Sequence, residues 1–563
     1  MESYSESFCS ESDRSEDESL TSNYSDELSG ESFDEETLNE NSSFEDDEEE
    51  DIDFGFWERY TENTNIENPI PVFRPNNNRV KGFFSHLEDP IEFFQLFIDN
   101  DYLDVICENT DAYYRIKNHD PRKKRDSHKR QWTKPNQEEI KAFLGLVLYM
   151  GLVKKSQLED YWSTSFLFGT PGFRDILSHD HFTHLLRNIC FYNVNTEPNT
   201  QDLLYKIRSL INKVINASQK LYTPGEYFTI DEGMVKFQGR HKLKIYMPLK
   251  PIKFGFKIYM LADSKSGYIY NWKLHDKNET SLVELITELV ENYKNKGYII
   301  CMDRFYTTID VISEMTKQGF GVIGCIMKNR FKANGTLLKA LGKLQRGESL
   351  FLCSQDQKLM LSCWQDIKLV CILSNIGDDK TSSVMRKTVS VDKTYRQEEK
   401  ECPDNVIIYS RNSRGVDKFD QVISYYINDH RSVKWYWRIV LHLLFVALYN
   451  SFIIYSDVKK KSPKLHTFIS YQKSVIKSLV SGLRRRKKIE ATPIKGKMKR
   501  SSTEFNFILP QDDECILEYT GLMDCIICKK KGLRKRTTYS CKFHKKSVCV
   551  LPCYDIHRKN TDL

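Results

Sequence analysis

The hydrophobic period of the chain changes twice along its length, and this limits the folds it can adopt. Residues 81–225 have the spacing of helices, with apolar side chains three and four positions apart. Between 226 and 330, β-branched and aromatic runs such as EYFTID, GFKIYMLADS and YIICMD alternate with turns and two helical runs. Residues 432–480 return to the helical period. This order predicts a mixed α/β protein in which a sheet is flanked by helices.

The composition between these blocks divides the chain further. Residues 331–403 combine polar turns with isolated strand-like runs, which we interpret as an insertion or small β subdomain within the α/β core. The segments we expect are an acidic disordered tail (1–80), a helical segment (81–225), the first part of the core (226–330), the insertion (331–403), the second part of the core (404–427), a second helical segment (428–482), a basic linker (483–514) and a Cys-rich domain (515–563).

Charge is distributed unevenly along the chain. Residues 1–53 hold 22 Asp and Glu and one basic residue, Arg14, whereas the remainder holds 82 Lys and Arg against 56 Asp and Glu. The residues after 53 therefore carry a formal charge of +26, which favours a polyanionic partner such as DNA. The acidic head has too few apolar residues to fold. It is either a solubility tail or an autoinhibitory segment with phosphorylatable serines.

Neither a signal peptide nor a membrane span is expected, and we expect no membrane partner. The longest apolar run, IVLHLLFVALYNSFIIY, contains His442 and Asn450 and is interpreted as a buried core helix. Fifteen cysteines in an apparently intracellular chain favour thiols and metal ligands over disulfides.

Acidic residues follow three strand-like or turn-like runs. Asp231 follows YFTI, Asp303 follows YIICM, and Asp417 lies in SRGVDKFDQ with Asp420 one helical turn later. Each is also compatible with a strand-end or helix-capping role. If adjacent strands bring them to one edge, Asp231, Asp303 and Asp417 would bind two Mg²⁺ ions, which activate water or a 3′-OH for in-line attack on phosphate. The basic residues expected to steady phosphates are Arg240, Lys250 and Arg304.

Two tryptophans lie just after the third acid, in RSVKWYWR. Trp435 and Trp437 can pack within a helix. Alternatively, they can stack on an unpaired base beside Arg431 and Lys434.

The C-terminal cysteines and histidines have the spacing of structural Zn²⁺ ligands. The seven cysteines and histidines between Cys525 and His557 that have this spacing are too many ligands for one tetrahedral ion. Two such ions need eight ligands, and Cys515 would supply the eighth. Reduced cysteines without metal are the alternative. We expect Cys525, Cys528, Cys549 and Cys553 to bind one ion, and Cys541, His544, His557 and Cys515 to bind the other.

Basic runs lie between these ligands and elsewhere. Residues 529–536, KKKGLRKR, hold six Lys and Arg and are interpreted as a phosphate-contacting loop. The runs at 122–130 and 483–488 are either DNA contacts or nuclear import signals, and all three are also compatible with an ordinary solvated surface. The DNA-binding residues expected in the loop are Lys529, Lys530, Lys531, Arg534, Lys535 and Arg536.

Six ordered blocks carry a resemblance to a known family: DEGMVKFQGR, KPIKFGFKIYMLADSKSGYIYNWKLH, MDRFYTT, GFGVIGCIMKNR, SRGVDKFDQVISYY and KWYWRIVLHLLFVALYNSFIIY. Together they resemble the piggyBac transposase family from about residue 81 to the C-terminus. The resemblance implies an RNase H-like core with catalytic Asp231, Asp303 and Asp417, and with Asp420 as a further acid. It places the family's aromatic position on Trp435. A cross-brace zinc domain that binds transposon ends is also implied, with His544 where many relatives have Cys.

The resemblance further implies cut-and-paste transposition at TTAA sites. Transposon ends would be nicked, hairpins formed and reopened, and 3′ ends joined to target DNA. The helical segments would join in a dimerisation and DNA-binding domain of a nuclear homodimer. The alternatives are a domesticated DNA-binding protein that no longer cuts DNA and a general RNase H-like nuclease.

Overall fold

The computed structural model of the chain describes most residues from 53 to 483 and from 517 to 559. Residues 1–52, 119–131, 197–200, 277–280, 390–394, 431–433, 484–516 and 560–563, and scattered single positions, lie outside the described residues. The chain divides into two compact units, residues 1–486 and 487–563.

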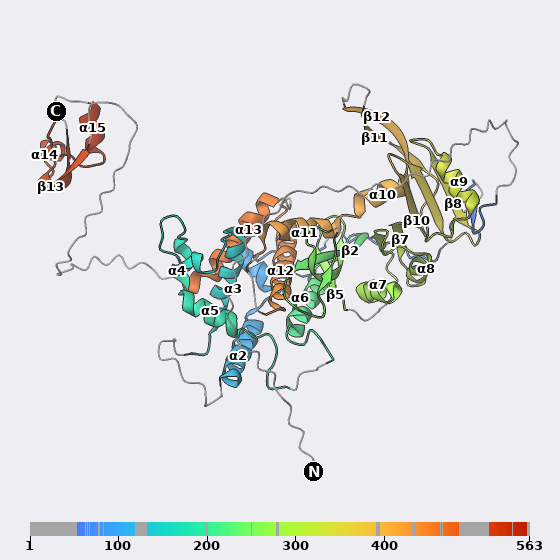
Figure 1. Ribbon diagram of the computed structural model, residues 1–563, viewed down its shortest axis with the longest axis horizontal. Helices are drawn as coiled ribbons and strands as arrows, with labels where there is room; N and C mark the ends of the chain where they lie inside the picture. The colour runs from blue at the N-terminus through green and yellow to red at the C-terminus, as the bar shows by residue number, and fades with distance from the viewer. Residues whose placement is uncertain are drawn as a thin grey trace, which may run out of the picture. The chain divides into compact units, whose positions relative to one another are not determined.

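A ten-stranded sheet organises the larger unit (Figure 1). Within this sheet, β5, β4 and β2 lie side by side and antiparallel. On the other side of β2, β6 pairs with it in parallel, and β7 pairs in parallel with β6. Helices α7 and α8 provide the crossovers between the parallel strands. The bounds are β2 (Tyr227–Lys236), β3 (Ile245–Tyr246), β4 (Phe254–Asp263), β5 (Ile269–Leu274), α7 (Leu282–Val290), η2 (Glu291–Tyr293), β6 (Ile299–Met302), α8 (Ile309–Lys317) and β7 (Gly321–Cys325).

Three strands of the expected insertion extend this sheet, and two others pair only with each other. β10 (Leu369–Ser374) pairs with β7, and β9 (Met360–Gln365) and β8 (Ser349–Ser354) follow outward. β11 (Thr381–Val389) and β12 (Tyr395–Pro403) form a two-stranded hairpin of their own. The expected boundary at residue 331 therefore falls inside a continuous sheet. The helices of this region are α9 (Gly335–Lys343), α10 (Asp404–Asn412) and α11 (Gly415–Tyr426).

The prediction of a disordered tail over residues 1–80 is wrong for its last part. β1 (Trp57–Arg59) pairs with β8, and Phe54 and Trp57 are each 1% exposed. The indole Nε1 of Trp57 donates to the carbonyl of Phe331 at 2.5 Å. Three aromatic residues, Phe54, Phe56 and Trp57, follow Asp53 closely, and their apolar surface stabilises this edge of the sheet when it is buried.

The helical segments before and after the sheet pack on each other, as Figure 1 shows. α12 contacts α1 and α6, and α13 contacts α1 and α3. Tyr471 in α13 donates to the carbonyl of Pro90 at 3.1 Å. The bounds are α1 (Pro90–Gln95), α2 (Asn100–Lys117), α3 (Gln137–Leu152), η1 (Glu159–Trp162), α4 (Pro171–Ile176), α5 (His179–Asn188), α6 (Arg208–Leu221), α12 (Trp437–Val458), α13 (Leu465–Leu479) and η3 (Ser481–Leu483).

The helix α12 is the longest apolar element among the described residues. It is long and apolar enough to cross a membrane, with a mean hydropathy of 1.9, but 94% of this window is buried inside the protein. Asn450 in α12 is fully buried; its Oδ1 accepts from the backbone N of Ile269 at 2.9 Å. Its Nδ2 donates to Ile269 O at 2.7 Å and to Ser218 Oγ at 2.9 Å. One amide therefore fastens both β5 and α6 to α12.

The smaller unit contains β13 (Leu517–Asp524), α14 (Ile526–Lys530), β14 (Arg536–Cys541) and α15 (Cys553–Lys559). β13 and β14 pair antiparallel. The buried core of this unit consists of four cysteines with Ile527 and Val548. So small an apolar core needs a further source of stability, such as bound metal.

Substitution of Asn450 tests this fastening. Asn450→Leu leaves the buried amide and carbonyl of Ile269 without their partners, and we expect the free energy of unfolding to fall by about 2–4 kcal/mol. Chemical denaturation followed by circular dichroism measures this change. Lys339→Ala, on the exposed surface of α9, is the control and should change stability by less than about 0.5 kcal/mol. Equal stability of the two variants would contradict the fastening role.

Candidate active site and zinc-binding clusters

The register of two parallel strands brings the first two predicted acids together. β2 and β6 pair in parallel, with Ile230 opposite Met302. Asp231 and Asp303 are the next residues on their strands. Since paired strands lie about 4.8 Å apart, acids separated by 72 positions in the sequence become neighbours at one edge of the sheet.

The helix α11 brings a third carboxylate to this edge. A Cβ atom placed on Gly233 would lie 3.2 Å from Oδ1 of Asp420 and 3.4 Å from its Oδ2. Gly233 lies on the same face of β2 as Asp231, two positions away. Asp417, in the first turn of α11, is exposed. The α11 carboxylate beside Asp231 is therefore the half-buried Asp420, one turn after the residue that the resemblance assigns to the third metal position.

Crowding of carboxylates in a partly buried site changes their acidity. Burial, with Glu232 and Asp303 nearby, raises the pKa of Asp231 to about 7. Burial, with Asp231 and Asp417 nearby, raises the pKa of Asp420 to about 7. Burial also raises the pKa of Asp303. A divalent cation would relieve this repulsion, and an all-oxygen ligand set suits Mg²⁺, so the residues present fit that ion.

A second carboxylate on β2, Glu232, was not among the predicted site residues. Its side chain is 9% exposed and lies 3.3 Å from Nζ of Lys250 and 3.8 Å from Nζ of Lys257. Tyr306 donates its hydroxyl to Glu232 Oε2 at 2.7 Å. Burial lowers the pKa of Lys250, but Glu232 and then Asp231 outweigh it and raise that pKa. Lys250 therefore stays charged beside the carboxylates, where it can bind a phosphate oxygen.

The turn between β4 and β5 holds the start of α11 in place. The hydroxyl of Thr229 bonds to Ser264 Oγ at 3.0 Å and accepts from the backbone N of Gly415 at 3.2 Å. The ammonium of Lys418, in α11, donates to the carbonyls of Ser264 and Lys265, both at 2.7 Å. These contacts attach the first turn of α11 to the sheet.

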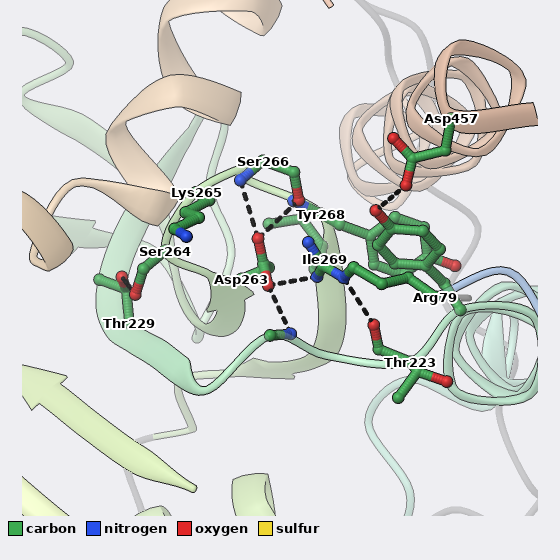
Figure 2. A network of polar contacts seen from close by, with 12 residues as sticks. Arg79, Thr223, Thr229, Asp263, Ser264, Lys265, Ser266, Tyr268, Ile269 and Asp457 are labelled. Atoms are coloured by element: carbon green, nitrogen blue, oxygen red, sulfur yellow. Dashed lines mark hydrogen bonds and ion pairs between the residues drawn. The ribbon is translucent and has the colours of Figure 1, made fainter. Parts of the chain in front are cut away.

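Asp263 fixes the other side of the same turn, as Figure 2 shows. This carboxylate is 1% exposed and accepts from Ser266 N and Ser266 Oγ, both at 2.8 Å, and from Gly225 N at 2.9 Å. Arg79 also donates to it, and Arg79 Nε donates to the carbonyl of Thr223 at 3.0 Å. The turn that positions α11 is thus tied to the chain segment that precedes the first helices.

The predicted phosphate-contacting residues of the larger unit differ in exposure. Arg240 and Arg304 are exposed, and Arg304 directly follows Asp303. Lys434 donates to the carbonyl of Ile189 at 3.2 Å, and burial lowers its pKa to about 8. Arg431 lies outside the described residues.

The two tryptophans have different surroundings. Trp437 is 4% exposed and packs against Phe143 inside the helical body, with ring centroids 5.9 Å apart. Trp435 is partly exposed and stacks on His241, with ring centroids 4.1 Å apart. Of the two aromatic rings, Trp435 is the one that solvent reaches.

In the smaller unit, the cysteines and histidines form two clusters. One holds Cys525, Cys528, Cys549 and Cys553, with a ligand atom from each within 4.8 Å of the others. In the second cluster, which contains His544 and His557, the Sγ atom of Cys541 lies 3.4 Å from Nδ1 of His544. The clusters alternate along the chain, which is the arrangement of a cross-brace. Cys515 lies outside the described residues.

The chemistry of these clusters fits Zn²⁺. Four cysteine sulfurs converge in the first cluster, a donor set suited to a tetrahedral site. His557 is fully buried, and among the described residues neither of its ring nitrogens has a hydrogen-bond partner. A buried imidazole without partners is unfavourable, and a metal bond would satisfy one of its nitrogens. The C-terminal cysteine cluster can therefore bind zinc.

The basic loop that follows the first ligand pair is exposed. Arg536 lies 3.5 Å from Asp524, and the loop otherwise presents its basic side chains on the surface of the unit. The exposed basic residues are Lys529, Lys530, Lys531, Arg534, Lys535 and Arg536.

Comparison with known proteins identifies the family. A family model described as Transposase IS4 matches residues 89–452, more than half of the chain. Human PiggyBac transposable element-derived protein 2 is 24% identical over 385 residues, covering 65% of this chain and 62% of that protein. Human PiggyBac transposable element-derived protein 3 is 25% identical over 411 residues, covering 70% and 65%. The chain thus spans less than two thirds of the length of these curated relatives.

The fold of the chain also matches that of a solved structure. A piggyBac transposase synaptic complex with hairpin DNA matches with a TM-score of 0.60 and 20% identity, over 85% of this chain and 100% of that one. At that identity the match shows a shared mixed α/β fold. The family model, the curated relatives and this fold agree, and the chain belongs to the piggyBac transposase family.

Removal of one crowded charge should stabilise the metal-free protein. Unfolded carboxyls ionise near pH 4, whereas Asp231 and Asp420 hold protons up to about pH 7 in the folded state. The folded state binds more protons in this window, so the free energy of unfolding falls as pH rises through it. At pH 8 with a chelator, Asp420→Asn should raise this free energy by about 1–3 kcal/mol in chemical denaturation.

The exposed neighbour Asp417 supplies the matched control. Asp417→Asn, one helical turn away, should change the free energy of unfolding by less than about 0.5 kcal/mol under the same conditions. A destabilised Asp420→Asn protein at pH 8 would show that the carboxylates do not repel each other.

Proposed function

We propose that the chain is a Mg²⁺-dependent DNA transposase that nicks transposon ends, forms hairpins and joins 3′-OH ends to TTAA target DNA. The observation that carries the proposal is the meeting of Asp231, Asp303 and Asp420 at one edge of the sheet. Family membership and the fold shared with a transposase–hairpin DNA complex support the same reaction.

The larger unit is proposed to contain an RNase H-like core. The strand order β5-β4-β2-β6-β7, with three antiparallel strands followed by two parallel ones, supports this assignment. The region 331–403 would be an elaboration of that core that continues its sheet. The helical segments 81–225 and 428–482, which pack on each other, would form the dimerisation and DNA-binding domain.

Each residue of the site has a proposed role in the reaction. When bound, two Mg²⁺ ions activate the attacking water or 3′-OH and stabilise the leaving oxygen. Asp231 and Asp303 would hold them from the sheet, and Asp417 and Asp420 from α11. Lys250, kept charged by Glu232, would orient the phosphate that is attacked.

DNA contacts outside the carboxylate site would hold the substrate. Arg240 and Arg304 would bind backbone phosphates, and Trp435 would stack on an unpaired base at the transposon end with Arg431 and Lys434 beside it. In the smaller unit, two Zn²⁺ ions would hold the fold that presents the basic loop 529–536 to the transposon ends. The protein would act in the nucleus as a homodimer.

A second candidate function is a DNA-binding protein that no longer cuts DNA. The names of the human relatives describe proteins derived from transposable elements, and this observation favours the second function. Retention of the carboxylates at one sheet edge favours the transposase.

Nicking of transposon ends separates the two functions. With Mg²⁺ and a TTAA-flanked end duplex selected for binding from a random library, the wild-type protein should produce nicks and hairpins on denaturing gels. Asp303→Asn should remove both products, because a metal ligand is lost, while the affinity for the duplex changes little. Asp310→Asn, an exposed acid in α8, is the control and should cut normally. Binding without any nicking by the wild type would favour the second function.

The metal content tests the C-terminal clusters independently. Elemental analysis of the full chain should give two zinc ions per chain. Cys528→Ser should reduce this to one, because it removes a ligand from the first cluster only. Cys107→Ser, a buried cysteine of the larger unit, should keep both ions. A wild-type chain purified without zinc, and unable to bind it when zinc is added, would overturn the assignment.

A further inference from the structure

Phe305 is an exposed aromatic residue next to the candidate active site, and the proposed function does not use it. It lies two residues after Asp303, at the end of β6, and 36% of it is exposed. Its backbone N donates to Oδ1 of Asp303 at 2.8 Å. The backbone of this exposed residue is therefore bonded to a carboxylate that, under the proposed function, would bind a metal ion beside the reacting phosphate.

The backbone around Phe305 is fixed by several hydrogen bonds. Arg330 Nη1 donates to the carbonyl of Phe305 at 2.6 Å and to that of Arg304 at 3.1 Å. The backbone N atoms of Tyr306 and Thr307 both lie 3.2 Å from the carbonyl oxygen of Asp303, to which they donate. A large apolar side chain on a rigid turn loses little freedom when it contacts a ligand, which favours binding.

A buried lysine lies against one face of the Phe305 ring. Lys257 is 7% exposed, and its Nζ is 4.3 Å from the centroid of the ring. The same ammonium lies 3.8 Å from Oε2 of Glu232. The Tyr306 ring stands perpendicular to that of Phe305, with centroids 5.0 Å apart. The ring is thus supported by a cation and a second ring, and 36% of the residue is open to solvent.

We propose that Phe305 stacks on the nucleobase that flanks the phosphate attacked at the carboxylates, and that Lys257 is a positioning residue for its ring. The inference rests on the proposed function, since the ligand is DNA at the cleavage point. Every nucleobase presents a π face, and stacking on an aromatic side chain contributes about 1–3 kcal/mol per base. A base unpaired during hairpin formation would lose its neighbour in the duplex and gain the Phe305 ring.

An abasic substrate separates stacking from a structural role. Single-turnover nicking with Mg²⁺ should be roughly 5- to 100-fold slower for Phe305→Ala than for wild type on the intact duplex. On a duplex that lacks the flanking base, the two proteins should nick at equal rates, because the base that stacks is absent. Phe305→Tyr should keep the wild-type rate on both duplexes, and Lys257→Met should follow Phe305→Ala with a smaller loss.

A binding measurement gives the same test without cleavage. With Ca²⁺ in place of Mg²⁺ and 2-aminopurine at the flanking position, the Phe305→Ala complex should be brighter than the wild-type complex, because stacking quenches this base. Phe166→Ala, at a residue that is 99% exposed between η1 and α4, is the control and should match wild type. Thermal denaturation of Phe305→Leu, which keeps bulk but no ring, checks that the turn stays folded.

The outcomes distinguish this inference from the proposed function. Equal losses for Phe305→Ala on intact and abasic duplexes, or unchanged 2-aminopurine fluorescence, would overturn the stacking role alone. A wild-type protein that binds the duplex but never nicks it would overturn the transposase function, and the fluorescence measurement would still decide the stacking. A wild-type protein that does not bind the duplex would overturn both.

Discussion

The parallel pairing of β2 with β6 is the contact on which the candidate active site depends. Because Ile230 lies opposite Met302, the residue that follows each of them is an aspartate at the same edge of the sheet. A shift of one residue in this register would turn one of the two carboxylates to the opposite face. The central strand β4, buried along nearly its whole length, anchors β2 on its other side and so supports this register.

Bringing carboxylates together in a partly buried place is costly, and the surrounding structure offsets part of that cost. Lys250 and Lys257 flank Glu232, so positive charge lies next to the acids. The Asp263 turn holds α11 against the sheet and keeps Asp420 from moving away from Asp231. The carboxylates of the site therefore repel one another while the surrounding hydrogen bonds hold them in position, and a bound cation would stabilise this arrangement.

Much of the fold was predictable because its signals are local. The change between helical and strand periods predicted the α/β class, and acids after apolar runs indicated Asp231 and Asp303, although β2 continues past Asp231 to Lys236. The edge strand β1 was missed because it pairs with β8, nearly 300 positions later, and such pairing has no local signature. The contacts of Glu232 were missed for the same reason, since Lys257 and Tyr306 come from a different strand and a different turn.

The sequence by itself indicated the candidate site residues: the aspartates in strand-like and turn-like runs, the interleaved cysteines and histidines, and the basic runs. Residue type and spacing along the chain are sufficient for that, because ligand chemistry and hydrophobic period are local properties. Only the tertiary structure decided which carboxylate of α11 lies beside Asp231, and that Lys257 lies against the Phe305 ring. These are distances between segments far apart in the sequence, and strand register and helix packing set them.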